Sequence, residues 1–379
     1  MIINGVGLNR EVYAQVKEIT LEIPDFKGYE TKYTTIIGPD GFFKFKFYPI
    51  TTREISLKPI ADVIIVHPGD SLYIGKDFKD IANAKFSGDA AELNNNVNKF
   101  LIGYYLGRYE TGKYNLKPED YKRYCQNYRN EAYTRLATFS EGHRTSDEFL
   151  KWAKSTIDID YYSALLHYLM YKKLTSETKI ESPVNYYDFL DDLNNGFDNT
   201  VICSNYFKLI DNYYNDYLGP IIGKKYRIET KRDHKRDSLF IDEISNYSKN
   251  NLINQFVVSH YFNQLLYSHE TEMFEKNNEF ITNKVKEPFL LKTLSDRYKF
   301  LKDYKANPEN LSNSMLGQSD LKNKSTGFTL NGPLRKDLVN KIIEGNKDKA
   351  IYIDFWATWC HHCISELEQS KKLIQNYTG

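Results

Sequence analysis

Apolar and polar residues alternate with a period of two along much of the first 88 residues, as they do in half-buried β-strands. The segment 43–47 reads Phe-Lys-Phe-Lys-Phe, which predicts a strand with one buried face. Pro39-Asp40-Gly41 and His67-Pro68-Gly69-Asp70 are turn sequences. Residues 1–88 therefore predict a small antiparallel β-sandwich, with further strands expected over 11–23, 29–37, 63–66 and 71–74.

From Ala90 onward the apolar positions recur at the spacing of one helix face, which predicts an all-α region over 89–305. Pro118 is expected near the start of one helix, and the segment 145–148 (TSDE) is expected to cap the next. Gly219-Pro220 and Glu287-Pro288 are expected to interrupt helices. The remaining helices are expected near 184–193, 202–217, 238–268, 270–285 and 288–304.

Residues 306–326 are rich in Asn and Ser and poor in large apolar residues, which is typical of a linker. After this linker, Phe328 to Gly332 predicts a short strand and turn, and Lys336 to Glu344 a short helix. The apolar segment 351–356 predicts a buried strand, and the segment 364–377 a helix. The expected fold class is therefore multidomain α+β, with domains at 1–88, 89–305 and 327–379.

Composition and charge exclude several classes of function. The chain has 379 residues with 51 Lys and Arg against 50 Asp and Glu, and its net charge of +1 gives no reason to expect nucleic acid or an anionic membrane as a partner. The longest apolar runs, such as Val63 to Val66, are too short to cross a bilayer. The residues Met1 to Gly5 lack the charged and apolar regions of a signal peptide, which by itself indicates the cytoplasm.

Several histidines and cysteines have a structural interpretation. His67 is expected to be a surface residue in a turn, and the spacing of His260 and His269 does not fit a zinc site. The 4 cysteines are too few for a disulfide scaffold. Cys125 and Cys203 are expected to be buried free thiols, with a disulfide between them as the alternative.

One segment specifies a chemistry. Cys360 and Cys363 are separated by two residues and lie between the predicted strand and the predicted helix. This is the arrangement of a dithiol redox site, because residues three apart are neighbours on the first helical turn and their sulfurs can close a disulfide. The free N–H groups and the dipole of the helix N-terminus favour the thiolate of Cys360, which is the attacking species.

The segment 354–363 (DFWATWCHHC) resembles the active-site signature of the thioredoxin superfamily and is most similar to that of exported TlpA/ResA-like thiol–disulfide oxidoreductases. The likeness consists of the cysteine pair, the preceding Trp359, the earlier Trp356-Ala357 and the acidic Asp354. By motif, the likeness covers residues 327–379. Upstream of residue 327, it rests only on the layout of a β-rich region followed by a helical region. The resemblance implies that 327–379 is the N-terminal part of a thioredoxin-like α/β domain.

The resemblance also implies roles for individual residues. Cys360 would be the nucleophile, Cys363 the resolving cysteine, and Asp354 a buried acid that transfers a proton at Cys363. Trp359 would pack beside the dithiol, and His361-His362 would stabilise the thiolate and raise the reduction potential. The alternative for Asp354 is a strand-end carboxylate that faces water. Disulfide reduction is the usual reaction in this family, and the histidines leave the oxidase direction open.

No cofactor and no metal are expected. A zinc site at Cys360, His361, His362 and Cys363 is the chemical alternative, but the second pair of ligands that structural zinc usually has is absent from the sequence. The resemblance implies protein disulfides or dithiols and an upstream electron donor as partners, and no nucleic acid. It implies the periplasm or cell envelope, with the signal or lipid anchor outside this chain, and it leaves a homodimer open.

Length complicates the redox interpretation. The segment from Gly327 to Gly379 is about half of the roughly 100 residues of a compact domain, and the strand 351–356 has no later strand to pair with. The chain is therefore expected to end within the thioredoxin-like domain, to carry the nucleophile and to be a poor catalyst. The alternative function is a non-catalytic binding or dimerisation scaffold built from residues 1–305, the larger part of the chain.

Overall fold

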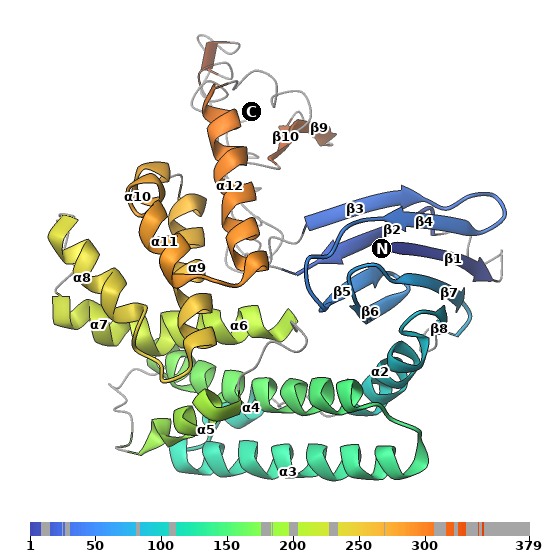
Figure 1. Cartoon of the computed structure of the whole chain (residues 1–379), viewed down its shortest axis with the longest axis horizontal. Helices are drawn as coiled ribbons and strands as arrows, with labels where there is room; N and C mark the ends of the chain where they lie inside the picture. The colour runs from blue at the N-terminus through green and yellow to red at the C-terminus, as the bar shows by residue number, and fades with distance from the viewer. Residues whose placement is uncertain are drawn as a thin grey trace, which may run out of the picture. The chain divides into compact units, whose positions relative to one another are not determined.

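A computed structural model describes most residues up to 306 and a few beyond (Figure 1). The stretches before residue 306 that it does not describe are 9–15, 25, 27–30, 81–83, 106–110, 176–182, 184, 197–203, 227–233 and 269. After residue 306 the described residues are 316–321, 325–330, 340, 343 and 344. The chain divides into two units, Met1–Asp303 and Tyr304–Gly379.

The first unit begins with eight strands in two four-stranded sheets. One sheet, called sheet A here, has the order β4-β1-β7-β8, and the other, sheet B, has the order β3-β2-β5-β6. The strands of sheet A are β1 (Ile2–Leu8), β4 (Phe42–Lys46), β7 (Ser71–Asp77) and β8 (Ala84–Gly88). Those of sheet B are β2 (Glu18–Ile23), β3 (Thr31–Ile36), β5 (Arg53–Lys58) and β6 (Ala61–Val66).

The inward faces of both sheets form one hydrophobic core. Phe43 and Ile74 of sheet A and Leu21 and Leu57 of sheet B belong to the same cluster of buried side chains. The period-two burial predicted for β4 is confirmed, because Phe43 and Phe45 are buried while their neighbours along the strand are exposed. Burying alternate residues of two facing sheets is what makes these short strands stable.

One pairing departs from the purely antiparallel sandwich expected from the sequence. β1 pairs antiparallel with β4 but parallel with β7, in a register that joins Ile2 to Ser71 and Leu8 to Asp77. Parallel neighbours need a long connection, and here the chain passes through both sheets between β1 and β7. The expectation was wrong at this pair because alternation shows which face of a strand is buried but not the direction of its neighbour.

The described residues after Gly88 in the first unit are mostly helical. The long ones are α2 (Ala91–Tyr105), α3 (Pro118–Gly142), α4 (Asp147–Thr175), α9 (Asn251–Tyr267) and α12 (Pro288–Ala306), which extends into the second unit. The shorter ones are η2 (Thr111–Asn115), η3 (Tyr186–Asp188), α5 (Phe189–Gly196), α6 (Ser204–Asn212), η4 (Tyr213–Leu218), α7 (Gly219–Tyr226), α8 (His234–Ile244), α10 (Thr271–Lys276) and α11 (Asn278–Lys284).

The helix boundaries differ from the expected ones where side chains compete with the helix. One helix was expected over 238–268, but α8 ends at Ile244 and α9 begins after Asn250, whose side chain accepts hydrogen bonds from the N–H groups of Leu252 and Ile253. This is an N-cap, which starts a helix where the apolar pattern alone shows no boundary. The helix expected over 270–285 is likewise divided, into α10 and α11.

Gly219-Pro220 was expected to interrupt a helix, but the helical path continues through it. α6, the π-helical turn η4 and α7 follow one another directly, and the N–H of Gly219 donates to the carbonyl of Tyr214, five residues back. Proline lacks an N–H and clashes with the carbonyl four residues earlier in a regular α-helix, so the helix widens just before it. A Cβ at position 219 would lie 2.9 Å from the Tyr214 carbonyl oxygen, which explains the glycine.

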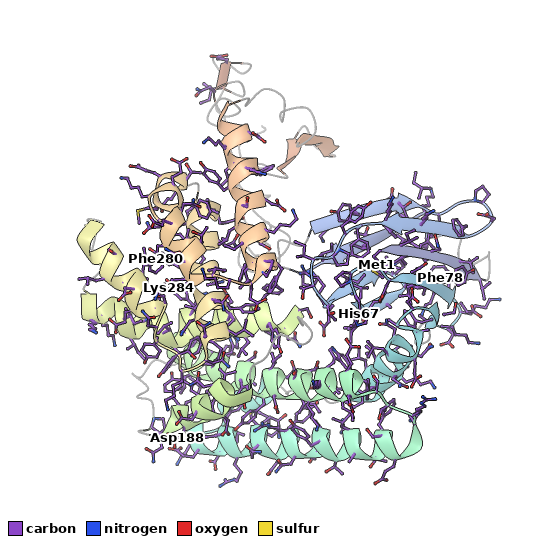
Figure 2. All side chains as sticks on the ribbon, in the orientation of Figure 1. Met1, His67, Phe78, Asp188, Phe280 and Lys284 are labelled. Atoms are coloured by element: carbon purple, nitrogen blue, oxygen red, sulfur yellow. The ribbon has the colours of Figure 1, made fainter. Side chains whose placement is uncertain are left out.

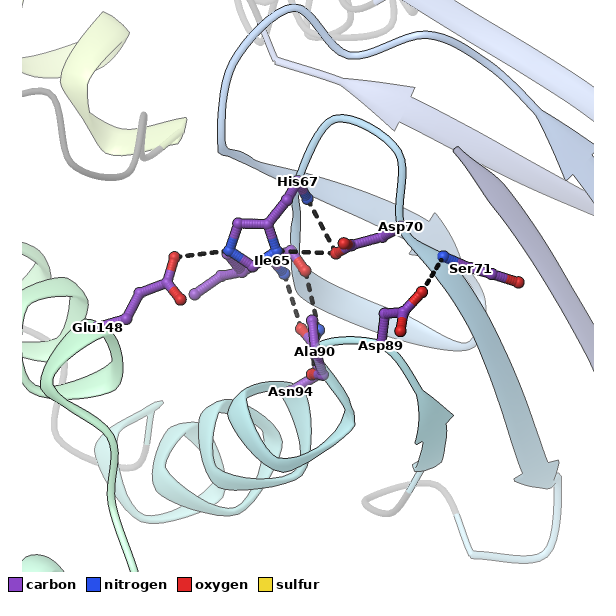
Figure 3. Close-up of polar contacts among 8 residues, drawn as sticks. All are labelled: Ile65, His67, Asp70, Ser71, Asp89, Ala90, Asn94 and Glu148. Atoms are coloured by element: carbon purple, nitrogen blue, oxygen red, sulfur yellow. Dashed lines mark hydrogen bonds and ion pairs between the residues drawn. The ribbon is translucent and has the colours of Figure 1, made fainter.

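Of three consecutive asparagines on α2, two hold this helix to the two sheets and the third to the segment between α3 and α4. The side chain of Asn94 accepts from the N–H of Ile65 on β6 at 2.7 Å and donates to its carbonyl at 2.8 Å (Figure 3). Asn95 does the same with Phe86 on β8, at 3.1 and 3.0 Å. Asn96 donates to the carbonyl of Arg144 at 2.7 Å. Since β6 and β8 each lie at the edge of a sheet, two adjacent side chains occupy hydrogen-bonding groups at one edge of each sheet.

The second unit has a two-stranded antiparallel hairpin of β9 (Leu316–Leu321) and β10 (Ser325–Leu330). The expectation of a linker over 306–326 was wrong in part, because β9 lies within that range. β10 includes Phe328, where a short strand was predicted, and Asn340, Ile343 and Glu344 are helical, as predicted for that segment.

We expect Asn94→Ala to lower the free energy of unfolding by about 2 kcal/mol or more, because it leaves the buried N–H and C=O of Ile65 without this partner. Urea denaturation followed by circular dichroism measures the effect. The control is Asn127→Ala on the exposed side of α3, which should change stability by less than about 0.5 kcal/mol. Equal stabilities of the two variants would contradict the role of Asn94.

Candidate functional site

The residues of the predicted dithiol site lie outside the described residues. This holds for all six of them: Asp354, Trp359, Cys360, His361, His362 and Cys363. Their roles remain predictions. The described residues do contain a set of buried polar contacts where sheet B meets the helices, and it is called the sheet–helix junction here. It consists of the contacts among Glu54, Ile65, His67, Asn94, Glu148, Trp152 and Ser204.

Glu54 is the most buried acid of the junction. It lies on β5 with 4% of its surface exposed. One carboxylate oxygen accepts from the indole N–H of Trp152 on α4 at 2.5 Å. The other accepts from both the backbone N–H and the hydroxyl of Ser204, at 2.7 Å each, where α6 begins. Both oxygens of the buried carboxylate are thus hydrogen-bonded.

The position of Glu54 explains why a charge is tolerated there. A helix N-terminus has free N–H groups and a partial positive charge, so a carboxylate beside Ser204 is stabilised by the helix dipole. Trp152 is among the largest fully buried side chains, and a buried indole N–H needs an acceptor. Glu54 therefore serves two helices at once, and removing it would leave donors of both without this acceptor.

His67 lies in the turn between β6 and β7 (Figure 2), and its contact with Glu148 connects this turn to α4 (Figure 3). Its Nδ1 is 2.8 Å from Asp70 Oδ2, and its Nε2 is 2.8 Å from Glu148 Oε1 in the first turn of α4. Burial lowers the pKa of His67, but the hydrogen bonds to Asp70 and Glu148 and their negative charges outweigh it, so the pKa is raised above its usual value. Protonated His67 can donate to both carboxylates at once.

The structure corrects the expectation that His67 is a plain surface residue. Only 29% of its side chain is exposed, and Glu148 lies far from it in the sequence. The turn sequence was correct, since the N–H of Asp70 donates to the carbonyl of His67. The sequence signal for the local contact was Asp70 three residues after His67, but no local signal indicated Glu148.

The described cysteine is unsuited to redox chemistry. Cys125 on α3 is a free thiol with no exposed surface, as predicted. Burial raises the pKa of this thiol to about 12, and a contact with Tyr121 lowers it by less. The thiolate is the reactive form of cysteine, so Cys125 is unreactive near neutral pH. Cys203, its alternative disulfide partner, lies outside the described residues.

His260 belongs to the helical core. It is fully buried on α9, and its Nε2 is 2.6 Å from Gln264 Nε2 and 3.4 Å from Asp211 Oδ1. In the described part of the chain, no group of three or more His, Cys, Asp or Glu side chains is placed to hold a metal ion. His269 is not among the described residues.

No protein-family model, curated protein or solved structure matches this chain. Function must therefore be inferred from the residues of the chain itself. None of the helices formed by described residues is long and apolar enough to cross a membrane.

We expect Glu54→Gln to lower the free energy of unfolding by about 2 kcal/mol, because the amide keeps the size of Glu54 but turns an NH₂ group towards N–H donors. Urea denaturation measures the loss. Glu18→Gln on β2 is the control, since Glu18 is exposed and its substitution should cost less than about 0.5 kcal/mol. A Glu54→Gln variant as stable as this control would show that the carboxylate is not needed.

We expect His67 to make stability depend on pH above about 6.5, the usual pKa of histidine. A group whose pKa is raised on folding contributes its stabilisation fully below its unfolded pKa of about 6.5, and this contribution is lost as the pH rises through the folded pKa. Replacing His67 by Gln should therefore cost on the order of 1 kcal/mol at about pH 6 and less at about pH 9.

Urea denaturation across this pH range checks the expectation. His143→Gln, which removes an exposed histidine, is the matched control and should keep the pH profile of the unaltered chain. If the His67→Gln variant kept that profile too, the two ion pairs of His67 would not contribute to stability.

Proposed function

We propose that the chain is a thiol–disulfide oxidoreductase of the cell envelope, acting as a disulfide reductase through Cys360 and Cys363. The single observation that carries the proposal is the segment 354–363. An acid and a tryptophan lie in the predicted strand, and a second tryptophan and a Cys-x-x-Cys pair follow that strand and lead into a predicted helix. The cysteine pair alone would be common to metal sites and redox sites, and its setting favours the redox site.

The reaction exchanges one disulfide for another. The Cys360 thiolate attacks one sulfur of a substrate disulfide, that S–S bond breaks, and one substrate sulfur leaves as a thiolate and takes up a proton. Cys363 then loses its proton and attacks the sulfur of Cys360 in the mixed disulfide. The Cys360–Cys363 disulfide closes and the second substrate thiol is released. Two electrons have passed to the substrate, and a dithiol donor must restore the pair.

The neighbours of the cysteines have distinct parts in this proposal. Asp354 accepts the proton of Cys363 so that it can attack the mixed disulfide. Trp359 shapes the surface on which a protein substrate docks. His361 and His362, when protonated, stabilise the Cys360 thiolate, which lowers its pKa and favours the reduced pair. A more stable reduced pair is a weaker reductant and a stronger oxidant when oxidised, so these histidines by themselves favour the oxidase direction. The reductase direction proposed here follows the usual reaction of the family that the segment resembles.

The finer architecture belongs to the same proposal. The structure has N-terminal β-sheets followed by helices. We propose that these are a sandwich-like domain and a helical domain that accompany a thioredoxin-like domain beginning near residue 327. The partners would be protein disulfides or dithiols and an upstream electron donor.

The decisive experiment equilibrates the chain in glutathione buffers of graded potential, alkylates free thiols and quantifies the peptide that contains Cys360 and Cys363. We expect one two-electron transition. We also expect Cys360 to be alkylated at a pH well below about 8.5, the pKa of a free cysteine. Cys363→Ser should accumulate a mixed disulfide with glutathione, because the resolving thiol is missing, and Cys360→Ser should accumulate much less.

Cys203→Ser is the control and should leave the transition unchanged, while Cys125 should resist alkylation in the folded chain because it is buried. If Cys360 and Cys363 titrated independently with ordinary pKa values, this chain would not carry a dithiol site. The scaffold interpretation of residues 1–305 would then be preferred.

A further inference from the structure

Strand β3 forms one edge of sheet B, with β2 as its neighbour (Figure 1). Its two large hydrophobic residues are exposed, Ile36 by 75% and Tyr33 by 46%. The sequence of β3, Thr-Lys-Tyr-Thr-Thr-Ile, consists mostly of strong strand formers and contains neither proline nor glycine. An exposed strand of this composition offers backbone groups to which another strand can pair.

The other three edges of sheets A and B are protected. Asn94 and Asn95 occupy backbone groups of β6 and β8. β4, the remaining edge of sheet A, carries the exposed Lys44 and Lys46 along its outer face. Exposed lysines on an edge strand are a common way of repelling a second strand.

β3 lacks this electrostatic protection. Its single charged residue, Lys32, lies opposite Glu22 on β2 and forms an ion pair with it, with Nζ 2.7 Å from Oε1. The two charges cancel within the same sheet. β3 is therefore an edge that is neutral and apolar at Tyr33 and Ile36, and no strand formed by described residues pairs with its outer side.

We propose that β3 pairs antiparallel with β3 of a second copy of this chain, so that two copies of sheet B join into one eight-stranded sheet. The pairing has a two-fold axis at Thr34, which places Thr34 opposite Thr34 of the second copy. Ile36 then lies opposite Lys32 of the second copy, and Tyr33 opposite Thr35. This inference goes beyond the redox proposal and does not depend on it.

The charges favour this register. Within each chain, Glu18 on β2 lies opposite Ile36 on β3, and Glu22 lies opposite Lys32. In the joined sheet, Lys32 of the second copy lies opposite Ile36, so it is in the same row of side chains across the strands as Glu18. The row then reads Glu18, Ile36, and Lys32 and Glu22 of the second copy, so no two residues of like charge are directly opposite. A pairing centred on Lys32 would instead place two lysines opposite each other, which is destabilising. Centring on Thr34 also covers Ile36, the more exposed of the two apolar side chains.

The first test measures the mass of the full chain in solution by light scattering under reducing conditions. We expect a dimer, and we expect Ile36→Lys to raise its dissociation constant at least about tenfold, because the new lysine would lie directly opposite Lys32 of the second copy. Ile221→Lys on α7 is the control, since Ile221 is also exposed (44%) but lies on a helix, and it should leave the dimer unchanged. Circular dichroism shows whether both variants are folded.

The second test uses a cross-link that reports the register. The Cα atoms of directly opposite residues in an antiparallel pair lie about 4.5–5.5 Å apart, within the range that a disulfide spans. In a background with Cys203, Cys360 and Cys363 replaced by serine, Thr34→Cys should therefore form a covalent dimer on mild oxidation. Thr20→Cys should not, because Thr20 lies one strand further in, opposite Thr34 of its own chain, and would be about 14 Å from its counterpart.

A dimer that Ile36→Lys weakens and Thr34→Cys locks would support the pairing of β3. A chain that is monomeric throughout, or a dimer equally sensitive to both lysine substitutions, would overturn it. So would a dimer that Thr20→Cys locks as readily as Thr34→Cys.

Discussion

The buried carboxylate of Glu54 is the contact on which the arrangement of the first unit depends most. It lies on a central strand of sheet B and accepts hydrogen bonds from Trp152 on α4 and from Ser204 at the start of α6. A buried charge is costly unless the charged group is paired or hydrogen-bonded, and both oxygens of Glu54 accept hydrogen bonds. The same geometry that satisfies Glu54 therefore fixes where two helices lie against the sheet.

Other hydrogen bonds at the junction also hold helices against sheet B. His67 joins the turn after β6 to α4, and Asn94 joins Ile65, near the end of β6, to α2. Ile65 of β6 and Phe26, which follows β2, contribute side chains to the hydrophobic core of the helices. The strands and helices of Met1–Asp303 thus share apolar surface as well as polar contacts. If Cys360 and Cys363 form a redox site, Met1–Asp303 is the larger, non-redox part of the same chain.

The elements of the fold were largely predictable because their signals are local. The alternation in β4 and the proline at the start of α12 are features of neighbouring residues, and the structure agrees with both. Glu54 was not predictable as a contact, since it is 98 residues from Trp152 and 150 from Ser204. The parallel pairing of β1 with β7 was missed for the same reason. The dithiol pair is the opposite case, because its whole signal is contained in the segment 354–363.

Native-state hydrogen exchange tests most directly whether the sheets and helices of the first unit fold as one. The informative amides are those of Ile65, which donates to Asn94, and Ser204, which donates to Glu54. If the junction is as strong as the core, both should exchange only on global unfolding, with the same free energy as amides in the middle of α9. Exchange of Ile65 and Ser204 through a smaller opening, while α9 stays protected, would show that the junction opens separately and would contradict this account.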